Sequence, residues 1–392
     1  MRKFYIIDFS AGNFVTHHLN YAITYFRFIQ NLGHECQIFL PKYLRQSEEL
    51  NSLPIKRILL SGNYKMLAGN FLAWRMYHKL VNFLGKIGSK FDKFLDKVIT
   101  KIYVYKSFKE IANNLDTRTE VEIIFPSVDL MSILILEKML LAQVPVSKYY
   151  LRINAVDKNM SSSKLDLDGL SILDRLIEKY PNISIGCETK NLLDWLVTRN
   201  YLYKESTWIP LPSIVRKNHK QNSNVFGFLG GAKKRKGFQE IPKWIEKISK
   251  EIPDSIFLVQ QSPFCWPGYK ETIQLLSSNP KIKLLPEFLS NSELFDQIAS
   301  CAFIVTPYDS QSYHLVGSSL FYYAADLLVP TISYSNLGFS EDILKFSCGI
   351  IVPDLSKGPE FNRNDIGKFR KSLIDYNSFR NKQNSDFLKI FS

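Results

Sequence analysis

Apolar and polar residues alternate along this chain in two periods, one typical of strands and one typical of helices. The opening run KFYIIDF (3–9) predicts a short buried strand, and the stretch 17–35 predicts a helix because its apolar residues recur every three or four positions. Gly33 ends that helix, and CQIFLP (36–41) predicts the next strand. Strand, helix and strand in this order form a βαβ unit, so we expect a parallel sheet with helices on both faces.

The same alternation continues to the end of the chain, with one interruption. We expect further strands in the first half at 54–60, 120–126, 148–154 and 183–189, and in the second half at 225–230, 255–261, 281–286, 302–307, 330–334 and 349–353. A proline-flanked, polar stretch at 208–224 separates the two halves and resembles a linker. A chain of 392 residues is long enough for two domains. We therefore predict an α/β protein with two doubly wound domains, at 1–212 and 213–392, with the last helix able to pack back on the first domain.

Charge is distributed unevenly along the chain. The net charge is +13, and ten Lys and Arg residues between Lys65 and Lys109 face only Asp92 and Asp96 in the same segment. Within segment 65–110, apolar residues at 91, 94, 95, 98, 99 and 102 form a helical stripe beside lysines at 86, 90, 93, 97 and 101. A basic amphipathic helix suits an anionic membrane surface. A helix that covers its own core and exposes a solvated basic face is the alternative.

Targeting and redox signals favour the cytoplasm, with peripheral attachment to the inner face of the plasma membrane. No apolar run reaches the length of about 18 residues that a membrane span needs, and the apolar part of the amino terminus is too short for a signal peptide. Five cysteines lie far apart without C-x-x-C spacing, so the sequence suggests neither a disulfide framework nor a zinc site.

The stretch GGAKKRKGF (230–238) is the clearest candidate for chemistry. It follows an expected strand and opens an expected helix, which is where backbone N–H groups and a helix dipole favour an anion. It is not a Walker loop, because the required glycine spacing is absent and Phe238 stands where a Ser or Thr is needed. A phosphate site and a solvated cationic surface both remain open on this stretch alone.

The order of several segments resembles a family-4-like glycosyltransferase of the GT-B fold, within the glycosyl transferases group 1. These segments are FLGGAKKRKGFQEIPKWI, IFLVQQS, the long stretch from KIKLLPEFL to VPTISY, and CGIIVP, preceded upstream by HHLNYAITYFRFIQNLGHECQIF and FPSVDLMSILILEKMLL. The resemblance implies two Rossmann-like domains facing a central cleft. It also implies transfer of a sugar from a nucleotide diphosphate sugar to an acceptor hydroxyl, with no metal or other cofactor.

By this resemblance, a cationic pair neutralises the departing diphosphate. Lys236 matches the family's lysine, and Lys233 or Arg235 must serve for its arginine, although lysine lacks the bidentate fork. The donor-binding set implied is Gly230, Gly231, Arg235, Gln260, Pro286, Glu287, Phe288, Tyr308, Asp309, Tyr313, Gly317, Ser318, Ser319 and Tyr323. Two alternatives stay open within this set: an N-cap role for Gly317–Ser319, and a buried, satisfied side chain at Gln260.

One position departs from the family pattern. Tyr323 stands where the family carries the glutamate that binds the nucleotide ribose. A noncatalytic sugar-nucleotide or glycan-binding relative is therefore an alternative, since a fold does not guarantee its chemistry.

Loops of the first domain that follow expected strands supply the acceptor-side candidates. His17 is a catalytic candidate at the start of the first helix, where a structural histidine is the alternative. The acceptor-binding candidates are Gly12, Asn13, His18, Ser127, Asn154, Glu188 and Thr189.

Together these features predict a retaining, metal-independent glycosyltransferase. Its expected partners are a nucleotide-sugar donor, a glycan or lipid-linked acceptor and an anionic membrane surface, in the biosynthesis of a surface polysaccharide, lipopolysaccharide or glycolipid. A basic nucleic-acid-binding protein is a further alternative, because the lysine patches would also suit a phosphate backbone.

Overall fold

The computed structural model describes residues 2–10, 17–42, 44, 48–60, 85–116, 118–156, 167–201, 206–214, 223–231, 233–261, 268–353 and 365–389, with side chains left undescribed at 17–18, 48–49 and 85–99. The chain forms two compact units. The first contains residues 1–186 and 197–207, and the second contains 187–196 and 208–391. The boundary in the chain thus lies five residues before the predicted one, and a ten-residue segment of the predicted first domain belongs to the second unit.

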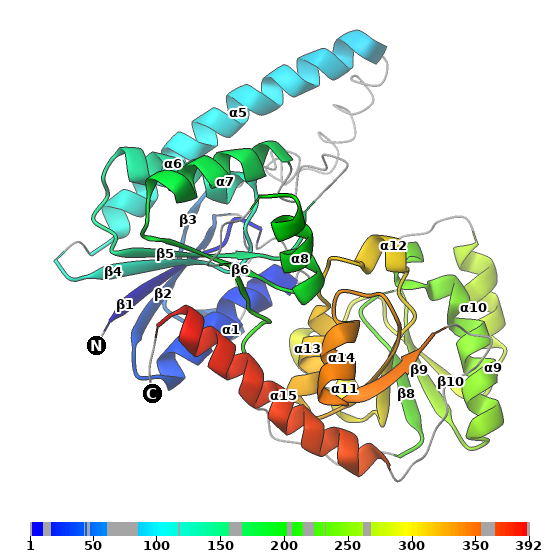
Figure 1. Cartoon of the computed structure of the whole chain (residues 1–392). Coiled ribbons are helices and arrows are strands. Elements are labelled where there is room, and N and C mark those ends of the chain that lie inside the picture. The colour runs from blue at the N-terminus through cyan, green and yellow to red at the C-terminus, as the bar shows by residue number, and fades with distance from the viewer. Residues whose placement is uncertain are drawn as a thin grey trace. The chain divides into compact units, whose positions relative to one another are not determined.

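A seven-stranded sheet forms the centre of the first unit (Figure 1). Its strand order is β3-β2-β1-β4-β5-β6-β7, and the pairs from β3 to β5 are parallel. The strands are β1 (Lys3–Ile7), β2 (Glu35–Pro41), β3 (Ile55–Leu59), β4 (Val121–Phe125), β5 (Lys148–Ile153), β6 (Ile183–Cys187) and β7 (Thr207–Trp208). The helices are α1 (His17–Asn31), α2 (Glu48–Asn51), α5 (Gly85–Asn114), α6 (Leu130–Leu141), α7 (Leu167–Lys179) and α8 (Lys190–Thr198), of which α8 lies largely in the segment assigned to the second unit.

The second unit repeats this plan with six parallel strands in the order β10-β9-β8-β11-β12-β13. The strands are β8 (Val225–Phe228), β9 (Ile256–Gln260), β10 (Ile282–Leu285), β11 (Phe303–Thr306), β12 (Thr331–Tyr334) and β13 (Gly349–Val352). The helices are α9 (Ile241–Glu251), α10 (Tyr269–Ser277), α11 (Asn291–Ala299), α12 (Ser310–Tyr313), α13 (Ser319–Asp326), α14 (Ser340–Phe346) and α15 (Asp365–Phe387). Both units therefore have the 3-2-1-4-5-6 order of Rossmann-like sheets, and the predicted α/β class is confirmed.

Packing requirements explain the short, apolar β8 strand. All four of its residues are buried, as expected for a strand that is covered on both faces. At Gly227 an added Cβ would lie 2.8 Å from Cys301 Sγ and 2.9 Å from Ile304 Cδ1, so only glycine fits between β8 and its neighbours. Beside this strand, the buried face of α9 presents Trp244, whose Nε1 donates to Tyr334 Oη at 3.0 Å.

The last helix holds the chain segment that enters the second unit. Buried Arg380 of α15 donates from Nε to Leu211 O at 2.6 Å and from Nη2 to Pro212 O at 3.1 Å, and its Nη1 lies 2.9 Å from Asp326 Oδ1. Every described residue of α15 belongs to the second unit. Packing of this helix back on the first domain stays a prediction.

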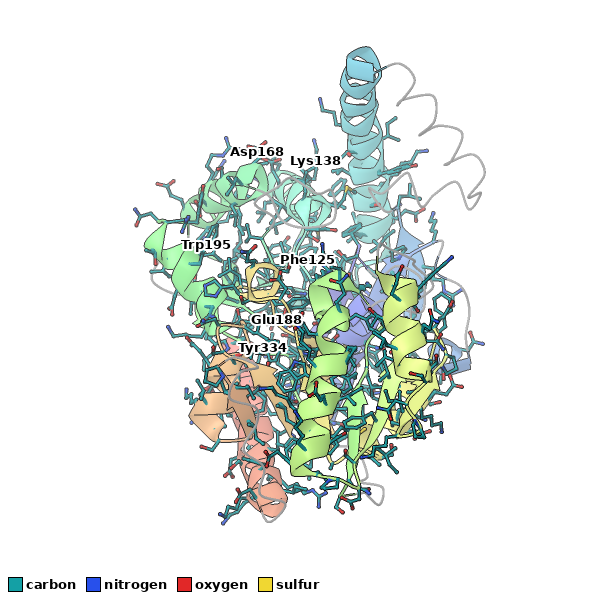
Figure 2. All side chains as sticks on the ribbon, turned by 90° about the vertical axis from the view of Figure 1, so that its right-hand side faces the viewer. Phe125, Lys138, Asp168, Glu188, Trp195 and Tyr334 are labelled. Atoms are coloured by element: carbon teal, nitrogen blue, oxygen red, sulfur yellow. The ribbon has the colours of Figure 1, made fainter. Side chains whose placement is uncertain are left out.

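The basic helix expected in segment 65–110 is present as α5, which projects beyond the other helices of the first unit (Figure 1). In its part with described side chains, Val104, Ser107 and Ile111 are buried, whereas Ile102 and Tyr105 are exposed. On the neighbouring helices α6 and α7, Figure 2 shows Lys138 and Asp168. Across the described helices, none has the length and hydropathy to cross a membrane.

Candidate functional site

Two loops of the second unit meet where its sheet reverses direction. The chain leaves β8 toward β9 on one side and leaves β11 toward β12 on the other, so the carboxyl ends of β8 and β11 form a topological switch point. We call this the second switch point. The loop after β8 carries the basic stretch 233–236, and the loop after β11 carries Tyr308 and Tyr313. The two loops are joined by a hydrogen bond from Asp309 N–H to Arg235 O at 3.1 Å.

Glycines make this close approach of the loops achievable. Gly237 has a φ of 66°, and a Cβ at this position would lie 1.7 Å from Pro307 O. Gly230 and Gly231 also have positive φ values, of 89° and 78°. Side chains other than glycine rarely adopt such angles, so the three glycines fix the path of the basic loop against the loop after β11.

Lys236 turns back over this loop, and its Nζ donates to Gly230 O. A Cβ on Gly230 would lie only 2.8 Å from that Nζ, so the absence of a side chain at residue 230 makes room for the ammonium. The Lys236 ammonium lies 5.6 Å from the centre of the Tyr308 ring, and the Arg235 guanidinium lies 5.8 Å from that of Tyr313. The two tyrosine rings contact each other at 4.5 Å, so two cations rest on one aromatic pair.

The electrostatics of this loop favour an anion. Burial lowers the pKa of Lys236 to about 7, and the nearby charges of Lys233 and Arg235 lower it further. Partial desolvation of its ammonium end and the charge of Arg235 also lower the pKa of Lys233. Among the described residues, none of these three cations forms an ion pair with a carboxylate. A bound anion would offset both the desolvation and the mutual repulsion.

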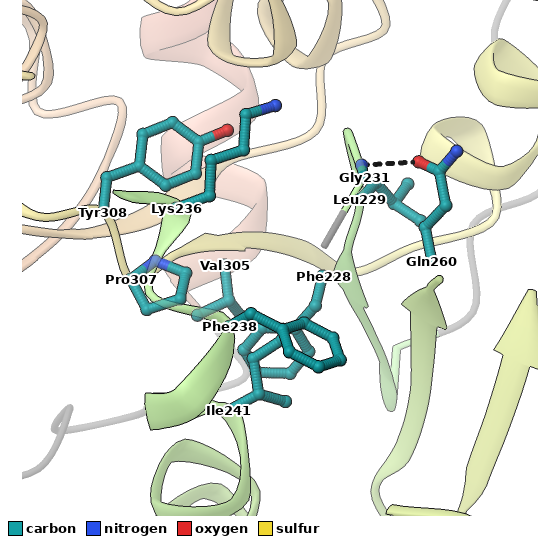
Figure 3. A pocket seen from close by; sticks show the side chains of 10 residues that line it. All are labelled: Phe228, Leu229, Gly231, Lys236, Phe238, Ile241, Gln260, Val305, Pro307 and Tyr308. Carbon is teal, nitrogen blue, oxygen red and sulfur yellow. Dashed lines mark hydrogen bonds between the residues drawn. The ribbon is translucent and has the colours of Figure 1, made fainter. Parts of the chain in front are cut away.

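Gln260, at the end of β9, has a clear structural role. Its Oε1 accepts from Gly230 N–H at 2.8 Å and from Gly231 N–H at 3.0 Å, while its Nε2 donates to Glu287 O at 3.4 Å. Figure 3 shows Gln260 and Gly231 on one side of a small cavity and Lys236 and Tyr308 on the other. That cavity measures about 20 Å³, which is room for about one water, so a diphosphate would have to lie at its mouth.

The other donor-side candidates divide into exposed and buried positions. Pro286, Glu287 and Phe288 form an exposed loop after β10. Asp309 caps α12 by accepting from Ser312 N–H at 3.0 Å, and its bonds to Ser312 lower its pKa.

The Gly317–Ser319 turn and Tyr323 lie at and within α13. The buried Ser318 hydroxyl accepts from Phe321 N–H at 3.4 Å and caps α13 ahead of Ser319. Tyr323 is buried in the same helix, and its ring centre lies 5.2 Å from that of Phe295.

The structure corrects the placement of two acceptor-side candidates. Glu188 and Thr189 are buried in the second unit, outside the predicted first domain. Thr189 Oγ1 donates to Leu315 O at 3.0 Å, and a Cβ on Gly317 would lie 2.4 Å from Glu188 Oε1. The Glu188 carboxylate therefore lies beside the turn that opens α13. An acceptor role for either residue stays a prediction.

The first unit has an equivalent first switch point, at the carboxyl ends of β1 and β4. Ser127 and Asn154 lie close together there, with Asn154 Nδ2 donating to Ser127 Oγ at 2.7 Å. Arg152 Nη1 donates to Asn154 Oδ1 at 3.0 Å and so orients the amide. Gly12 and Asn13, and the side chains of His17 and His18, lie outside the described part of the chain.

Sequence reasoning missed an acidic pair at the first switch point. Asp8 follows β1 and accepts from Ser10 N–H at 2.8 Å, while the Ser10 hydroxyl donates to Asp129 Oδ2 at 3.0 Å. Burial raises the pKa of the Asp129 carboxyl. Asp129 also caps α6 through Ser132, and the spacing of Asp129 and Ser132 ahead of an apolar run is the signal that could have located it.

Comparison with known proteins gives the fold. No family model and no curated protein sequence matches the chain. It is similar to the N-terminal domain of Candida albicans trehalose-6-phosphate phosphatase, with a TM-score of 0.62 at 9% identity, covering 99% of this chain and 96% of that one. Anabaena HepE in complex with UDP has a TM-score of 0.58 at 10% identity and full coverage of both chains. Sucrose-phosphate synthase from Thermosynechococcus elongatus has a TM-score of 0.55 at 11% identity, covering 99% and 94%.

The chain spans 56% of the length of Staphylococcus aureus TarM, at a TM-score of 0.45 that supports no further argument. The full-length matches establish a GT-B fold with two Rossmann-like units, as the sequence predicted. The predicted cleft between the domains stays a prediction.

Proposed function

We propose that this protein is a glycosyltransferase that moves a sugar from a nucleotide diphosphate sugar to a glycan or lipid-linked acceptor. The observation that carries the proposal is the meeting of Lys236 and Arg235 with Tyr308 and Tyr313 at the second switch point. This is where open α/β sheets bind their ligands.

The chemistry follows from the charge that develops during transfer. As the bond between the sugar and the diphosphate breaks, negative charge grows on the leaving group. Cations already in place stabilise it without reorganisation, by several kcal/mol in a site with little water. Lys236, desolvated and held over Gly230, is the residue best placed to do so, with Arg235 or Lys233 as the second cation. We assign to this pair the role that a metal ion has in metal-dependent transferases, and we propose a metal-independent, retaining reaction.

A nucleotide diphosphate is also the ligand of a full-length structural relative, since HepE is in complex with UDP. In this chain the exposed loop 286–288 would lie along the base, because Gln260 links it directly to the glycine turn. On the acceptor side, Ser127, Asn154 and Asp129 offer hydroxyl, amide and carboxylate groups suited to sugar hydroxyls.

We further propose peripheral attachment to an anionic membrane through α5, in the synthesis of a surface polysaccharide or glycolipid. In its described half, Ile102 and Tyr105 are 45% and 61% exposed, and exposed Lys101, Lys106 and Lys109 share their side of the helix. Co-sedimentation tests this: vesicles rich in phosphatidylglycerol should retain more protein than neutral vesicles, and Tyr105→Glu should reduce the difference. Equal retention by both vesicles would remove the proposal.

The activity itself is tested by incubating purified protein with a panel of nucleotide sugars and measuring release of the nucleoside diphosphate. We expect one donor to be hydrolysed slowly without acceptor and faster with glycan acceptors, and Lys236→Ala to abolish both reactions. No turnover of any donor, with unchanged binding of all donors in Lys236→Ala, would contradict the proposal.

A noncatalytic binding protein is the second candidate, and Tyr323 favours it. A buried phenol packed on Phe295 occupies the position where the family resemblance expects a ribose-binding carboxylate. This candidate predicts that a nucleotide sugar raises the melting temperature while no release of nucleoside diphosphate is detected. Tyr323→Glu separates the two: a gain in donor affinity would place residue 323 beside the ribose.

A further inference from the structure

A second feature of the first unit has the properties of a ligand site and lies away from both switch points. It is an open hollow of about 480 Å³, within the usual size range of small-molecule sites. The starts of β1 and β3, the middle of β2 and the end of α5 surround it. Catalytic ligands of such sheets bind at the opposite, carboxyl ends of the strands, so this hollow is separate from the proposed transfer chemistry.

The strand residues that line the hollow are unusually polar. The parallel register pairs Tyr5 with Gln37 and Phe39 with Lys56, so Lys3, Tyr5, Gln37 and Lys56 share one face of the sheet. Parallel strands covered by helices are normally apolar on such a face. Four polar side chains in adjoining positions therefore indicate a role other than core packing.

The end of α5 holds the cations of this hollow in place. Asp116 Oδ2 lies 3.0 Å from Lys3 Nζ, and its Oδ1 lies 3.0 Å from Arg118 Nε. Asp116 N–H in turn donates to Tyr5 Oη at 3.0 Å, which anchors the carboxylate to the sheet. The Arg118 guanidinium and Lys3 ammonium beside Asp116 hold the pKa of that carboxyl well below its usual range. Asp116 is thus a fixed support for two cations.

Lys56 is positioned differently. Its Nζ donates to the amide oxygen of Asn114 at 3.0 Å, and among the described residues it forms no ion pair. The lining thus contains three cationic side chains, Lys3, Lys56 and Arg118, against the one carboxylate of Asp116. A phosphate monoester carries a charge of about −1.5 to −2 at neutral pH, which matches this excess of two positive charges.

We infer that this hollow binds a phosphate monoester group, carried either by a small soluble metabolite or by a lipid headgroup. Lys56 and Lys3 supply ammonium donors to the phosphate oxygens, and Arg118 closes the exposed side. Amide groups of Gln37 and Asn113 line the rest of the hollow and suit the hydroxyl groups of a glycerol or sugar attached to the phosphate. The inference does not depend on the proposed transfer reaction.

Calorimetry tests the site with glycerol 3-phosphate as the probe, using full-length protein that carries Lys236→Ala so that the second switch point contributes no phosphate binding. We expect Lys56→Gln to weaken binding by about tenfold or more, because a charge-assisted bond is lost. Asn113→Asp, at an exposed position, should weaken it to a similar degree by like-charge repulsion. Lys138→Gln, an exposed lysine of the same unit outside the hollow, is the matched control and should leave the affinity unchanged.

The source of the phosphate is resolved with vesicles. Phosphatidic acid carries the same glycerol phosphate monoester, whereas phosphatidylglycerol carries a diester. Stronger retention on phosphatidic acid that is lost in Lys56→Gln identifies a lipid headgroup, and a response to the soluble probe alone identifies a metabolite. The inference is overturned if Lys56→Gln and Asn113→Asp, both folded by circular dichroism, bind glycerol 3-phosphate as the parent does. It is also overturned if the parent shows no binding of the probe up to roughly 10 mM, the limit of weak binding.

Discussion

The two sheets of this protein share one strand order but differ in the side chains at their switch points. At the first switch point, Ser10, Ser127, Asp129 and Asn154 form a network of hydroxyl, carboxylate and amide groups. At the second, cations rest on two tyrosine rings, and no carboxylate pairs with them among the described residues.

This difference shows that topology supplies a place for a ligand, while a few loop residues decide which ligand suits it. A network of neutral and acidic hydrogen-bonding groups suits sugar hydroxyls. Unpaired, desolvated cations suit a diphosphate. The proposed division of labour between acceptor and donor rests on this contrast, and the predictions below test it from the largest expected effect to the smallest.

Removal of the Lys236 ammonium should have the largest effect. We expect Lys236→Ala to lower kcat/KM for donor turnover by about 10² to 10³, as loss of one positioned donor to a developing anion does in other enzymes. Lys234→Ala is the matched control, because Lys234 is an exposed lysine of the same loop, and it should change kcat/KM by less than about twofold. Equal losses in both variants would reduce the loop to a diffuse cationic surface.

The two adjacent glycines offer a paired test of how Lys236 is held. Both Gly230→Ala and Gly231→Ala force a side chain into positive φ and should lower the free energy of unfolding by about 1 kcal/mol, measured in urea. Only the methyl group at residue 230 would meet Lys236 Nζ, since nothing lies within 4 Å of the corresponding position at residue 231. We expect a loss of kcat/KM of about tenfold or more for Gly230→Ala alone. Similar kinetics for the two variants would show that the position of the ammonium is unimportant.

At the first switch point, Asn154→Ala should act on the acceptor only. It removes the hydrogen bonds to Ser127 Oγ and from Arg152, and we expect the acceptor KM to rise by about tenfold. Donor hydrolysis without acceptor should stay unchanged. Ser147→Ala, at the opposite end of the same sheet, serves as the control. A matching loss of donor hydrolysis in Asn154→Ala would break the contrast between the switch points.

The pH dependence gives the smallest effect. Burial and the neighbouring cations place the pKa of Lys236 at about 7, so this side chain is charged below pH 7 and neutral above it. We expect kcat/KM to fall by about fivefold between pH 7 and pH 8, while kcat falls only at higher pH because a bound diphosphate raises the pKa. Lys236→Arg should remove the break, since arginine stays charged. A profile that is flat from pH 6 to pH 9 in the parent would contradict this role of Lys236.

Much of the fold could be predicted from the sequence because its signals are local. Buried strands such as VFGF and helices such as IPKWIEKISKE show their periods directly, and a basic loop between such elements marks the second switch point. The GT-B assignment needed only the order of these elements.

The parts that could not be predicted depend on contacts between residues far apart in the chain. Gln260 looked like a donor-binding residue, yet it holds Gly230 and Gly231, which lie about thirty residues earlier in sequence. Glu188 lies in the second unit because Thr189 bonds to Leu315, more than a hundred residues away. No local pattern shows either contact.

The polar lining at the start of the first sheet was missed for a similar reason. Lys3, Lys56 and Asp116 come together only through parallel register and the end of a long helix. Each residue by itself resembles an ordinary surface charge.

Calorimetric binding of nucleoside diphosphates at pH 6.5 tests the central claim most directly, namely that Lys236 and its loop hold the diphosphate. For the tightest ligand of the series, the account predicts equal dissociation constants for the parent and Asn154→Ala, and a value about tenfold or more higher for Lys236→Ala. Unchanged affinity in Lys236→Ala, or a loss confined to Asn154→Ala, would contradict it.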